Sequence, residues 1–243
     1  MDKEKIVILG CGRKGKEVKD FIERYELFEV AGFTVNKKYM TEDTFEGLPV
    51  YPLEELDKTF NKDDIYTFAA SSHFNYLNRV KRILYNELKE RGYKVANLIS
   101  PLATVKTKAL GDGNWINDFA YIDEETEIGS NNVLCPYAYI AHYSHIGSHN
   151  FFGIRSLIAG GVHIKNQCFV GIGATVFNMV HIGEKCIVGA GTIVKKNIKD
   201  FCMCRVGEVN NIEVYEYDSD SIEKKLGPMD SFARKDYDTV KRS

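Results

Sequence analysis

The sequence predicts an α/β domain followed by an all-β parallel β-helix, and two observations predict this architecture. In the first hundred residues, short apolar runs alternate with segments whose apolar residues have helical spacing. This order is typical of a small parallel sheet covered by helices. From residue 110 onward, an aliphatic residue or Phe recurs at every sixth position without an insertion. That period fits neither a helix nor an ordinary strand, and it is typical of a β-helix with three short strands per coil.

The composition of the 243-residue chain is that of an ordinary globular protein, with 44% hydrophobic and 27% charged residues. Its formal net charge is -2, so no basic excess favours binding to nucleic acid. The N-terminus lacks the apolar region of a signal peptide. The stretch 128–154 has no charged residue, but Ser, Asn, Gly, Pro and His interrupt it, which argues against a membrane span. The six cysteines include no CxxC pair, and we expect a cytoplasmic protein.

The first hundred residues predict four strands, at 6–9, 29–35, 65–70 and 93–99. A helix is expected after the first strand, because Val18, Phe21, Ile22 and Tyr25 lie on one face of such a helix. A second helix is expected over 74–91 for the same reason. Strands and helices that alternate in this way predict a parallel sheet.

The segment Gly10-Cys-Gly-Arg-Lys-Gly15 joins the first strand to the first helix. A G-x-G-x-x-G loop in this place directs backbone N–H groups toward a bound phosphate, and Arg13 and Lys14 would add positive charge. The second strand ends in Thr34-Val35-Asn36, without the acidic residue that binds the ribose of NAD. We therefore expect a phosphate-bearing ligand other than NAD. A tight turn without a ligand is the alternative.

The six-residue repeat contains fifteen consecutive apolar positions. Side chains alternate along a strand, so these positions point inward, as does the mostly small residue four places after each. Cys168 and Cys186 occupy such small positions and are expected to pack in the core. The fifteen residues are Leu110, Ile116, Ile122, Ile128, Leu134, Ile140, Ile146, Phe152, Ile158, Ile164, Val170, Val176, Ile182, Val188 and Val194.

With three hexapeptides per coil, residues 18 apart should stack at the inter-strand distance of about 4.8 Å. The outward residues then form three columns, which we call the tyrosine, histidine and phenylalanine faces. The apolar phenylalanine face is expected to pack against another subunit in a cyclic trimer. The columns are, in that order, Tyr121, Tyr139, Leu157, Thr175 and Ile193; Glu127, His145, His163 and His181; and Val133, Phe151, Phe169 and Ile187.

Three segments carry a resemblance to a known family: IVILGCGRKGKEV, the junction NLISPLATV, and the hexapeptides through GIGATVFNMVHIGEKCIVGAGTIVKKNI. The chain resembles the bacterial nucleotide-sugar acyltransferases of the sialic-acid O-acetyltransferase and bacillosamine-pathway N-acetyltransferase type. The resemblance implies a Rossmann-like nucleotide-sugar-binding domain over 1–100 and a left-handed parallel β-helix over 101–200. It also implies a homotrimer. Residues 201–243 are expected to form a cap and a tail.

For the chemistry, the resemblance implies acetyl-CoA as co-substrate and His142 as the general base. Histidine suits this role because it is half neutral near physiological pH. The family has Glu after this histidine, where this chain has Tyr143. The 18-residue rule offers Glu124 or Glu125 as the supporting carboxylate from the preceding coil.

The resemblance also implies the binding residues. Gly160, Ile172 and Ala190 are expected to hold the pantetheine arm of acetyl-CoA in a groove between subunits. The nucleotide-linked amino sugar is expected at the loop residues Gly12, Arg13 and Lys14, with Val35 and Asn36 near the base or ribose. No resident metal is assigned.

The histidine face leaves three interpretations open: a hydrated column at a subunit interface, contact with substrate or CoA, and a metal site shared between subunits. For the whole protein we expect transfer of acetyl to the amino group of a nucleotide-linked amino sugar. The alternatives are O-acetylation of a sialic-acid-like sugar, a γ-type β-helix metalloenzyme, and a non-catalytic trimeric scaffold.

Overall fold

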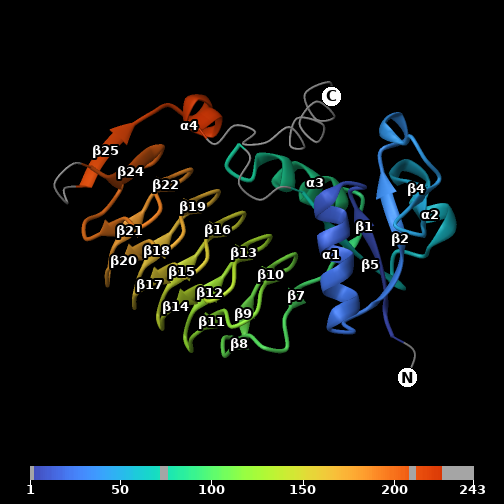
Figure 1. Cartoon of the computed structure of the whole chain (residues 1–243), viewed down its shortest axis with the longest axis horizontal. Helices are drawn as coiled ribbons and strands as arrows, with labels where there is room; N and C mark the ends of the chain where they lie inside the picture. The colour runs from blue at the N-terminus through green and yellow to red at the C-terminus, as the bar shows by residue number, and fades with distance from the viewer. Residues whose placement is uncertain (1–2, 72–75, 208–211, 226–243) are drawn as a thin grey trace. The chain divides into compact units, whose positions relative to one another are not determined.

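A computed structural model describes residues 3–71, 76–207 and 212–225 (Figure 1). The chain divides into two compact units. Among the described residues, 3–71 and 80–98 form an α/β unit, and 76–79, 99–207 and 212–225 form a second unit. In this part of the chain no helix has the length and apolarity needed to cross a membrane. The predicted tail after 225 lies outside the described residues.

The α/β unit contains a six-stranded sheet in the order β3-β4-β2-β1-β5-β6. Every pair is parallel except β3–β4. The elements are β1 (Lys5–Leu9), α1 (Arg13–Arg24), β2 (Glu29–Val35), the 3-10 turns Lys37–Tyr39 and Leu53–Glu55, β3 (Thr44–Phe45), β4 (Leu48–Pro52), α2 (Leu56–Thr59), β5 (Ile65–Ala69), α3 (Arg79–Glu90) and β6 (Lys94–Val95).

The predicted strands at 6–9, 29–35 and 65–70 and the helix after the first strand are confirmed. The second helix begins at Arg79 rather than at residue 74, and Tyr76, Leu77 and Asn78 before it have positive φ. The strand expected over 93–99 is two short strands, β6 and β7 (Leu98–Ile99). The short hairpin of β3 and β4 was not predicted.

The glycine loop joins β1 to α1 with almost no space between them. A Cβ atom at Gly15 would lie 2.1 Å from the carbonyl oxygen of Gly10. Gly10 itself has φ of 128° and lies against the backbone of Ala70. Close backbone packing therefore requires both glycines, whether or not a ligand binds.

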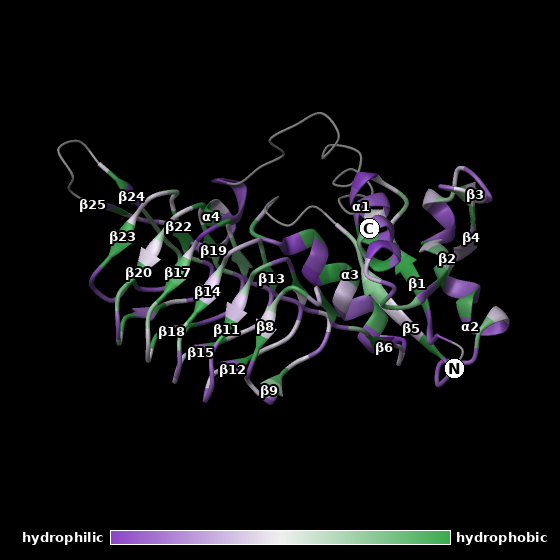
Figure 2. Cartoon of the chain, turned by 60° about the horizontal axis from the view of Figure 1, so that its bottom comes forward, coloured by the Kyte–Doolittle hydropathy of each residue, from purple (hydrophilic) through white to green (hydrophobic). Residues whose placement is uncertain are grey.

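The second unit is a parallel β-helix, as the six-residue period predicts. In Figure 2 the hydrophobic colour recurs along its successive strands. The tyrosine-face sheet contains β8 (Thr104–Val105), β11 (Tyr121–Ile122), β14 (Tyr139–Ile140), β17 (Leu157–Ile158), β20 (Thr175–Val176) and β23 (Ile193–Val194). The histidine-face sheet contains β9 (Ala109–Leu110), β12 (Glu127–Ile128), β15 (His145–Ile146), β18 (His163–Ile164) and β21 (His181–Ile182).

The phenylalanine-face sheet is the longest. It begins at β7 and continues through β10 (Trp115–Ile116), β13 (Val133–Leu134), β16 (Phe151–Phe152), β19 (Phe169–Val170), β22 (Ile187–Val188), β24 (Cys202–Val206) and β25 (Ile212–Glu216). All neighbours from β10 to β24 pair in parallel, and β25 is antiparallel to β24. From β10 to β22 the pairing joins residues 18 apart, for example Phe151 with Phe169, whereas β22 pairs with β24 at a separation of 16, Ile187 with Met203.

The repeat residues form one continuous core. Fourteen of the fifteen predicted inward positions are buried, and Leu110 is half-buried against them. Cys168 and Cys186 lie in this core, as expected. Asn114, Asn132 and Asn150 stack inward at one corner, where the side-chain oxygen of each accepts a hydrogen bond from the backbone N–H 18 residues later. This ladder satisfies backbone donors that the tight corner would otherwise bury unpaired.

The phenylalanine face is not the exposed apolar column on which the prediction of subunit packing rested. Within the single chain, Val133 is 1% and Ile187 3% exposed. The cover comes from the chain itself, and at Ile187 it includes Leu77 and Ile222. These two residues are distant in sequence from the repeat, so the hexapeptide pattern contains no sign of them.

Ile222 belongs to α4 (Ser219–Lys225), which follows the hairpin of β24 and β25. A buried carboxylate anchors this helix. Glu223 lies 2.8 Å from the Lys185 ammonium and 3.3 Å from the Arg79 guanidinium, and it accepts a hydrogen bond from Gln167. The described part of 201–243 is thus a hairpin and a helix that lies over the phenylalanine face.

Candidate active site

His142 lies in the four-residue turn between β14 and β15, at the edge shared by the tyrosine and histidine faces. Its side chain is 56% exposed. The next residue, Tyr143, has φ of 57°, the left-handed conformation that the third residue of the neighbouring turns also adopts, as at Glu125 and Met179. This conformation turns Tyr143 outward, and its ring packs nearly perpendicular to the His142 ring, with the ring centroids 5.2 Å apart.

The two ring nitrogens of His142 have different surroundings. Nδ1 lies 3.5 Å from Oδ2 of Asp123, in the turn of the preceding coil. Nε2 faces Gly160 in the turn of the following coil, where a Cβ atom would lie only 2.9 Å away. A side chain at 160 would therefore obstruct Nε2. Gly160 was predicted to hold acetyl-CoA, and the structure places it directly beside the predicted base.

The carboxylate beside His142 belongs to Asp123 and not to Glu124 or Glu125, the two residues that the 18-residue spacing predicts. The structure records no contact of Glu124 or Glu125 with His142, although all three residues are described. Asp123 precedes His142 by 19 residues, and its side chain is only 17% exposed. Hydrogen bonding from the Glu124 backbone N–H lowers the pKa of Asp123, and Lys106 and His142 act in the same direction.

Ile172 and Ala190 lie at the opposite edge of the tyrosine face, in the turns that follow β19 and β22. Both are exposed, and the Ile172 side chain is 59% exposed. Gly160 and this pair therefore occupy different edges of one face. Between the edges the face is apolar and open, with Leu157 41% and Ile193 45% exposed.

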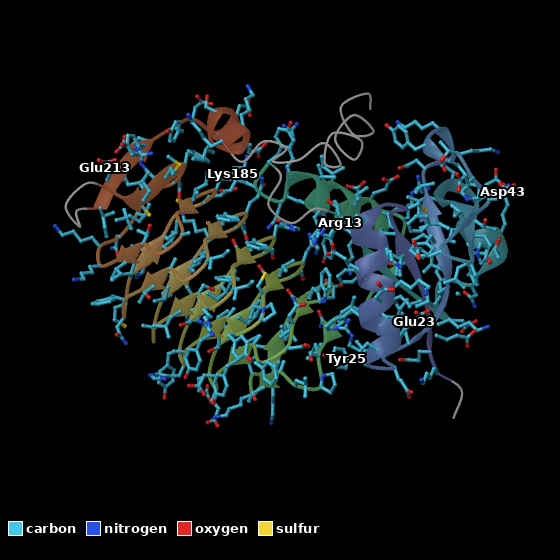
Figure 3. All side chains as sticks on the ribbon, viewed as in Figure 1. Arg13, Glu23, Tyr25, Asp43, Lys185 and Glu213 are labelled. Atoms are coloured by element: carbon cyan, nitrogen blue, oxygen red, sulfur yellow. The ribbon has the colours of Figure 1, made fainter. Side chains whose placement is uncertain are left out.

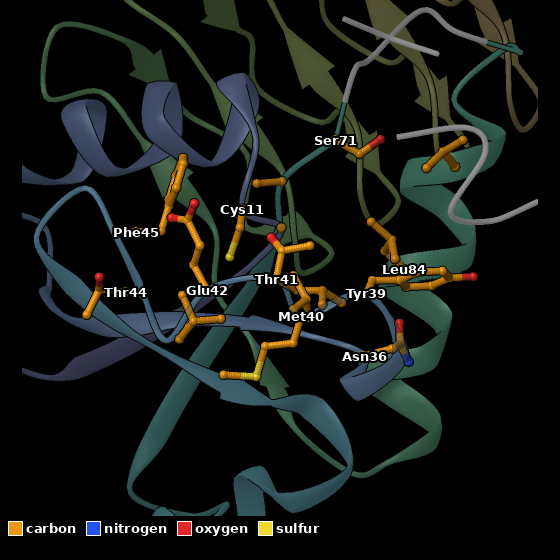
Figure 4. Close-up of a pocket in the computed structure, with 16 residues that line it drawn as sticks. Cys11, Asn36, Tyr39, Met40, Thr41, Glu42, Thr44, Phe45, Ser71 and Leu84 are labelled. Carbon is orange, nitrogen blue, oxygen red and sulfur yellow. The ribbon is translucent and has the colours of Figure 1, made fainter. Parts of the chain in front are cut away.

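The α/β unit contains a pocket of about 340 Å³ (Figure 4). Val35 and Asn36, at the end of β2, line it together with Gly10 and Cys11 from the glycine loop. Asn36 donates a hydrogen bond from Nδ2 to Glu87 at 2.7 Å. The carboxyl ends of parallel strands meet at this pocket, the usual ligand position in such sheets. Met40, Glu42 and Phe45 also line it, although no motif in the sequence indicates them.

Gly12, Arg13 and Lys14 do not line this pocket. Gly12 is the residue before α1, and Arg13 begins the helix (Figure 3). Both cations are paired with Glu17, Arg13 at 3.1 Å. Val35 and Asn36 therefore lie in the pocket. Gly12, Arg13 and Lys14 lie at the N-terminus of α1, directly after the pocket residues Gly10 and Cys11.

The histidine face is a stack of imidazole rings. The ring centroids of His145 and His163 are 4.5 Å apart, as are those of His163 and His181. Glu127 lies 3.0 Å from Nδ1 of His145. Burial and the two flanking histidines lower the pKa of His163. Over the described residues, no group of three or more His, Cys, Asp or Glu side chains is arranged to hold a metal ion.

No family model matches the chain, and no curated protein matches it. Among solved structures, it is similar to PerB from Caulobacter crescentus in complex with CoA and GDP-perosamine, at 26% identity and a TM-score of 0.72 over 86% of this chain and 97% of that one. Two further structures of that perosamine N-acetyltransferase carry an Asn or an Ala in place of one histidine.

Two other solved structures share the fold. WeeI from Acinetobacter baumannii is 22% identical with a TM-score of 0.70, over 86% of this chain and 99% of that one. The acetyltransferase domain of PglB from Neisseria gonorrhoeae is 19% identical with a TM-score of 0.70, over 83% of this chain and 96% of that one. The hexapeptide solenoid and the α/β unit before it make the chain similar in structure to solved hexapeptide-repeat sugar N-acetyltransferases, as the resemblance in the sequence predicts.

Proposed function

We propose that the protein transfers the acetyl group of acetyl-CoA to the amino group of a nucleotide-linked amino sugar, with His142 as general base. The observation that carries the proposal is the exposed His142, whose Nε2 faces the side-chain-free Gly160. The similarity to PerB over most of both chains, in a complex that contains CoA and a GDP-linked amino sugar, supports the two substrates.

The proposed reaction uses Nε2 of His142, the ring nitrogen that no side chain obstructs. The amine nitrogen attacks the thioester carbonyl carbon while Nε2 of His142 accepts the proton that the nitrogen loses. When the carbon–sulfur bond breaks, the CoA thiolate leaves and takes that proton from the imidazolium. The products are the N-acetyl sugar and CoA with a free thiol, and His142 returns to its neutral form.

We propose that the pocket of Val35 and Asn36 holds the nucleotide and that the α/β unit is a Rossmann-like nucleotide-sugar-binding domain. The Gly12, Arg13 and Lys14 segment would lie near the diphosphate, at the N-terminus of α1, where the helix dipole favours an anion. Because Arg13 and Lys14 are already paired with Glu17, their net attraction for a phosphate is reduced.

We further propose a cytoplasmic homotrimer of left-handed β-helices in which the tyrosine face points toward the threefold axis. This face is apolar and exposed, and the phenylalanine face is covered by the chain itself. In a cyclic trimer with this orientation, the Gly160 edge of one subunit meets the Ile172 and Ala190 edge of the next. The resulting groove would hold the pantetheine arm of acetyl-CoA beside His142.

The test is a thiol-release assay with the purified full chain, acetyl-CoA and GDP-, UDP- and dTDP-linked amino sugars. We expect release with at least one of them, and a product that carries one acetyl group on nitrogen by mass spectrometry. If the enzyme acetylates a free sialic acid and none of the nucleotide-linked amino sugars, the proposal is wrong and the protein is an O-acetyltransferase. Stoichiometric zinc without thiol release would favour a metalloenzyme.

A further inference from the structure

Three consecutive coils each contribute one charged or ionisable side chain to a line that ends at His142. Lys106 follows β8, Asp123 follows β11 and His142 lies just after β14. These strands pair in parallel, Thr104 with Tyr121 and Tyr121 with Tyr139, so the turns after them lie beside one another. We propose that Asp123 is the positioning residue for His142 and that Lys106 holds Asp123 in place. This inference rests on the function proposed above.

The Asp123 carboxylate is held from three directions. Oδ1 accepts a hydrogen bond from the Glu124 backbone N–H at 2.9 Å, and it lies 3.4 Å from the Lys106 ammonium. Oδ2 faces Nδ1 of His142 at 3.5 Å. A carboxylate with these partners stays ionised at physiological pH and keeps one orientation.

Lys106 is fixed in turn by its surroundings. Its ammonium lies 3.6 Å from Glu124 and 5.3 Å from the centre of the Tyr121 ring. Tyr121 stacks on Tyr139, with ring centroids 4.8 Å apart and planes 6° from parallel. The hydrogen bond to Tyr121 and, after it, the Asp123 carboxylate raise the pKa of Lys106. Lys106 therefore remains a cation beside the Asp123 carboxylate.

The pair decides which ring nitrogen is free for chemistry. If Nδ1–H donates to Asp123, the Nε2 lone pair points to the unobstructed space beside Gly160. The carboxylate also stabilises the imidazolium that forms when Nε2 accepts a proton. Tyr143 cannot do this, because its side chain has a hydroxyl and no carboxylate. Asp123 thus supplies from the preceding coil the anion that the residue after His142 does not provide.

The first experiment compares Asp123→Asn with the matched control Glu125→Gln, a neighbouring carboxylate in the same turn. Asn can keep the hydrogen bond from the Glu124 N–H but does not carry the charge. We expect kcat to fall roughly 10- to 100-fold, a part of the 10²- to 10⁴-fold that a well-positioned general base contributes, with the KM for both substrates within about twofold of wild type. Asp123→Glu should recover part of the loss, and Glu125→Gln should retain wild-type kcat. Far-UV circular dichroism checks that each variant folds.

The second experiment does not depend on turnover. Nitrogen-15 NMR of the histidine rings, assigned with His142→Asn, should show the Nδ1–H tautomer of His142 in wild type and a mixture in Asp123→Asn. Two results would overturn the inference: wild-type kcat in Asp123→Asn, or an unchanged tautomer. If no amino sugar is acetylated by wild type, the proposed function fails, while the NMR comparison still decides the role of Asp123.

Discussion

The Nε2 atom of His142 and the α-carbon of Gly160 face each other so closely that a Cβ atom at position 160 would lie 2.9 Å from the nitrogen. Real Cβ contacts are almost never this short, so Gly160→Ala must displace the imidazole or block its nitrogen. We expect kcat to fall at least about tenfold, because a positioned base is lost. The melting temperature should change little, since the exposed ring can swing into solvent. A Gly160→Ala enzyme with full activity would mean that Nε2 is not the reacting atom.

His142→Asn removes the base without a large change in shape. We expect kcat to fall about 100-fold, the lower end of what general base catalysis contributes, because an amine can also attack with help from water. His181→Asn, on the histidine face, is the matched control and should keep wild-type activity. Equal losses in both variants would assign the effect to something other than base catalysis.

Leu157→Glu tests the proposed trimer. This substitution places a charge in the middle of the exposed tyrosine face, where burial against a neighbouring subunit would desolvate it. We expect light scattering to show dissociation and the acetylation rate to fall with it, because the groove for acetyl-CoA needs two subunits. His181→Glu is the comparison on the other open face. If His181→Glu dissociates the assembly and Leu157→Glu does not, the interface is the histidine face.

Ile222→Ala tests how firmly α4 is attached. Ile222 is fully buried against Leu77 and Ile187. Truncation of a buried Ile costs about 2–5 kcal/mol, and we expect a value near the lower limit because the site lies at the periphery and can relax. Urea unfolding measures the loss. Val214→Ala, at a half-exposed position of the hairpin, should leave the stability nearly unchanged.

Acid should weaken the start of α4 through Asp218. Its carboxylate accepts hydrogen bonds from the Ser221 hydroxyl and from the backbone N–H groups of Ser221 and Asp220, which lower its pKa. A group whose pKa is lower in the folded state stabilises the fold above its ordinary pKa, and this stability is lost as the pH falls through the lowered value. The melting temperatures of wild type and Asp218→Ala should therefore differ at neutral pH and approach each other in acid. A constant difference across the titration would contradict the assignment.

The strands of the solenoid were predictable almost residue by residue, because a strict six-residue period leaves one register that buries every aliphatic side chain. The glycine loop was equally clear, since Gly10 and Gly15 meet backbone atoms that only glycine can approach. Both patterns are local in sequence. The residues of the hexapeptide repeat and of the glycine loop are therefore sufficient to predict the local structure of each segment.

The errors came from contacts that the repeat does not encode. Ile187 appeared exposed because its cover, Leu77 and Ile222, comes from segments outside the hexapeptides. Asp123 was missed because the 18-residue rule aligns backbone positions, whereas a side chain in a turn can reach toward a neighbour one residue out of register. The pocket residues Met40 and Phe45 belong to a short segment after β2 whose composition carried no signal.

The antiparallel partner at the end of the longest sheet has a consequence for solubility. A parallel solenoid that simply stopped would present unpaired backbone groups to the first strand of another molecule, and such edges promote growth into filaments. Here β25 reverses direction on β24 and carries two acidic side chains, Glu213 and Glu216. The terminal hairpin thus makes the end of this sheet a poor template for end-to-end polymerisation.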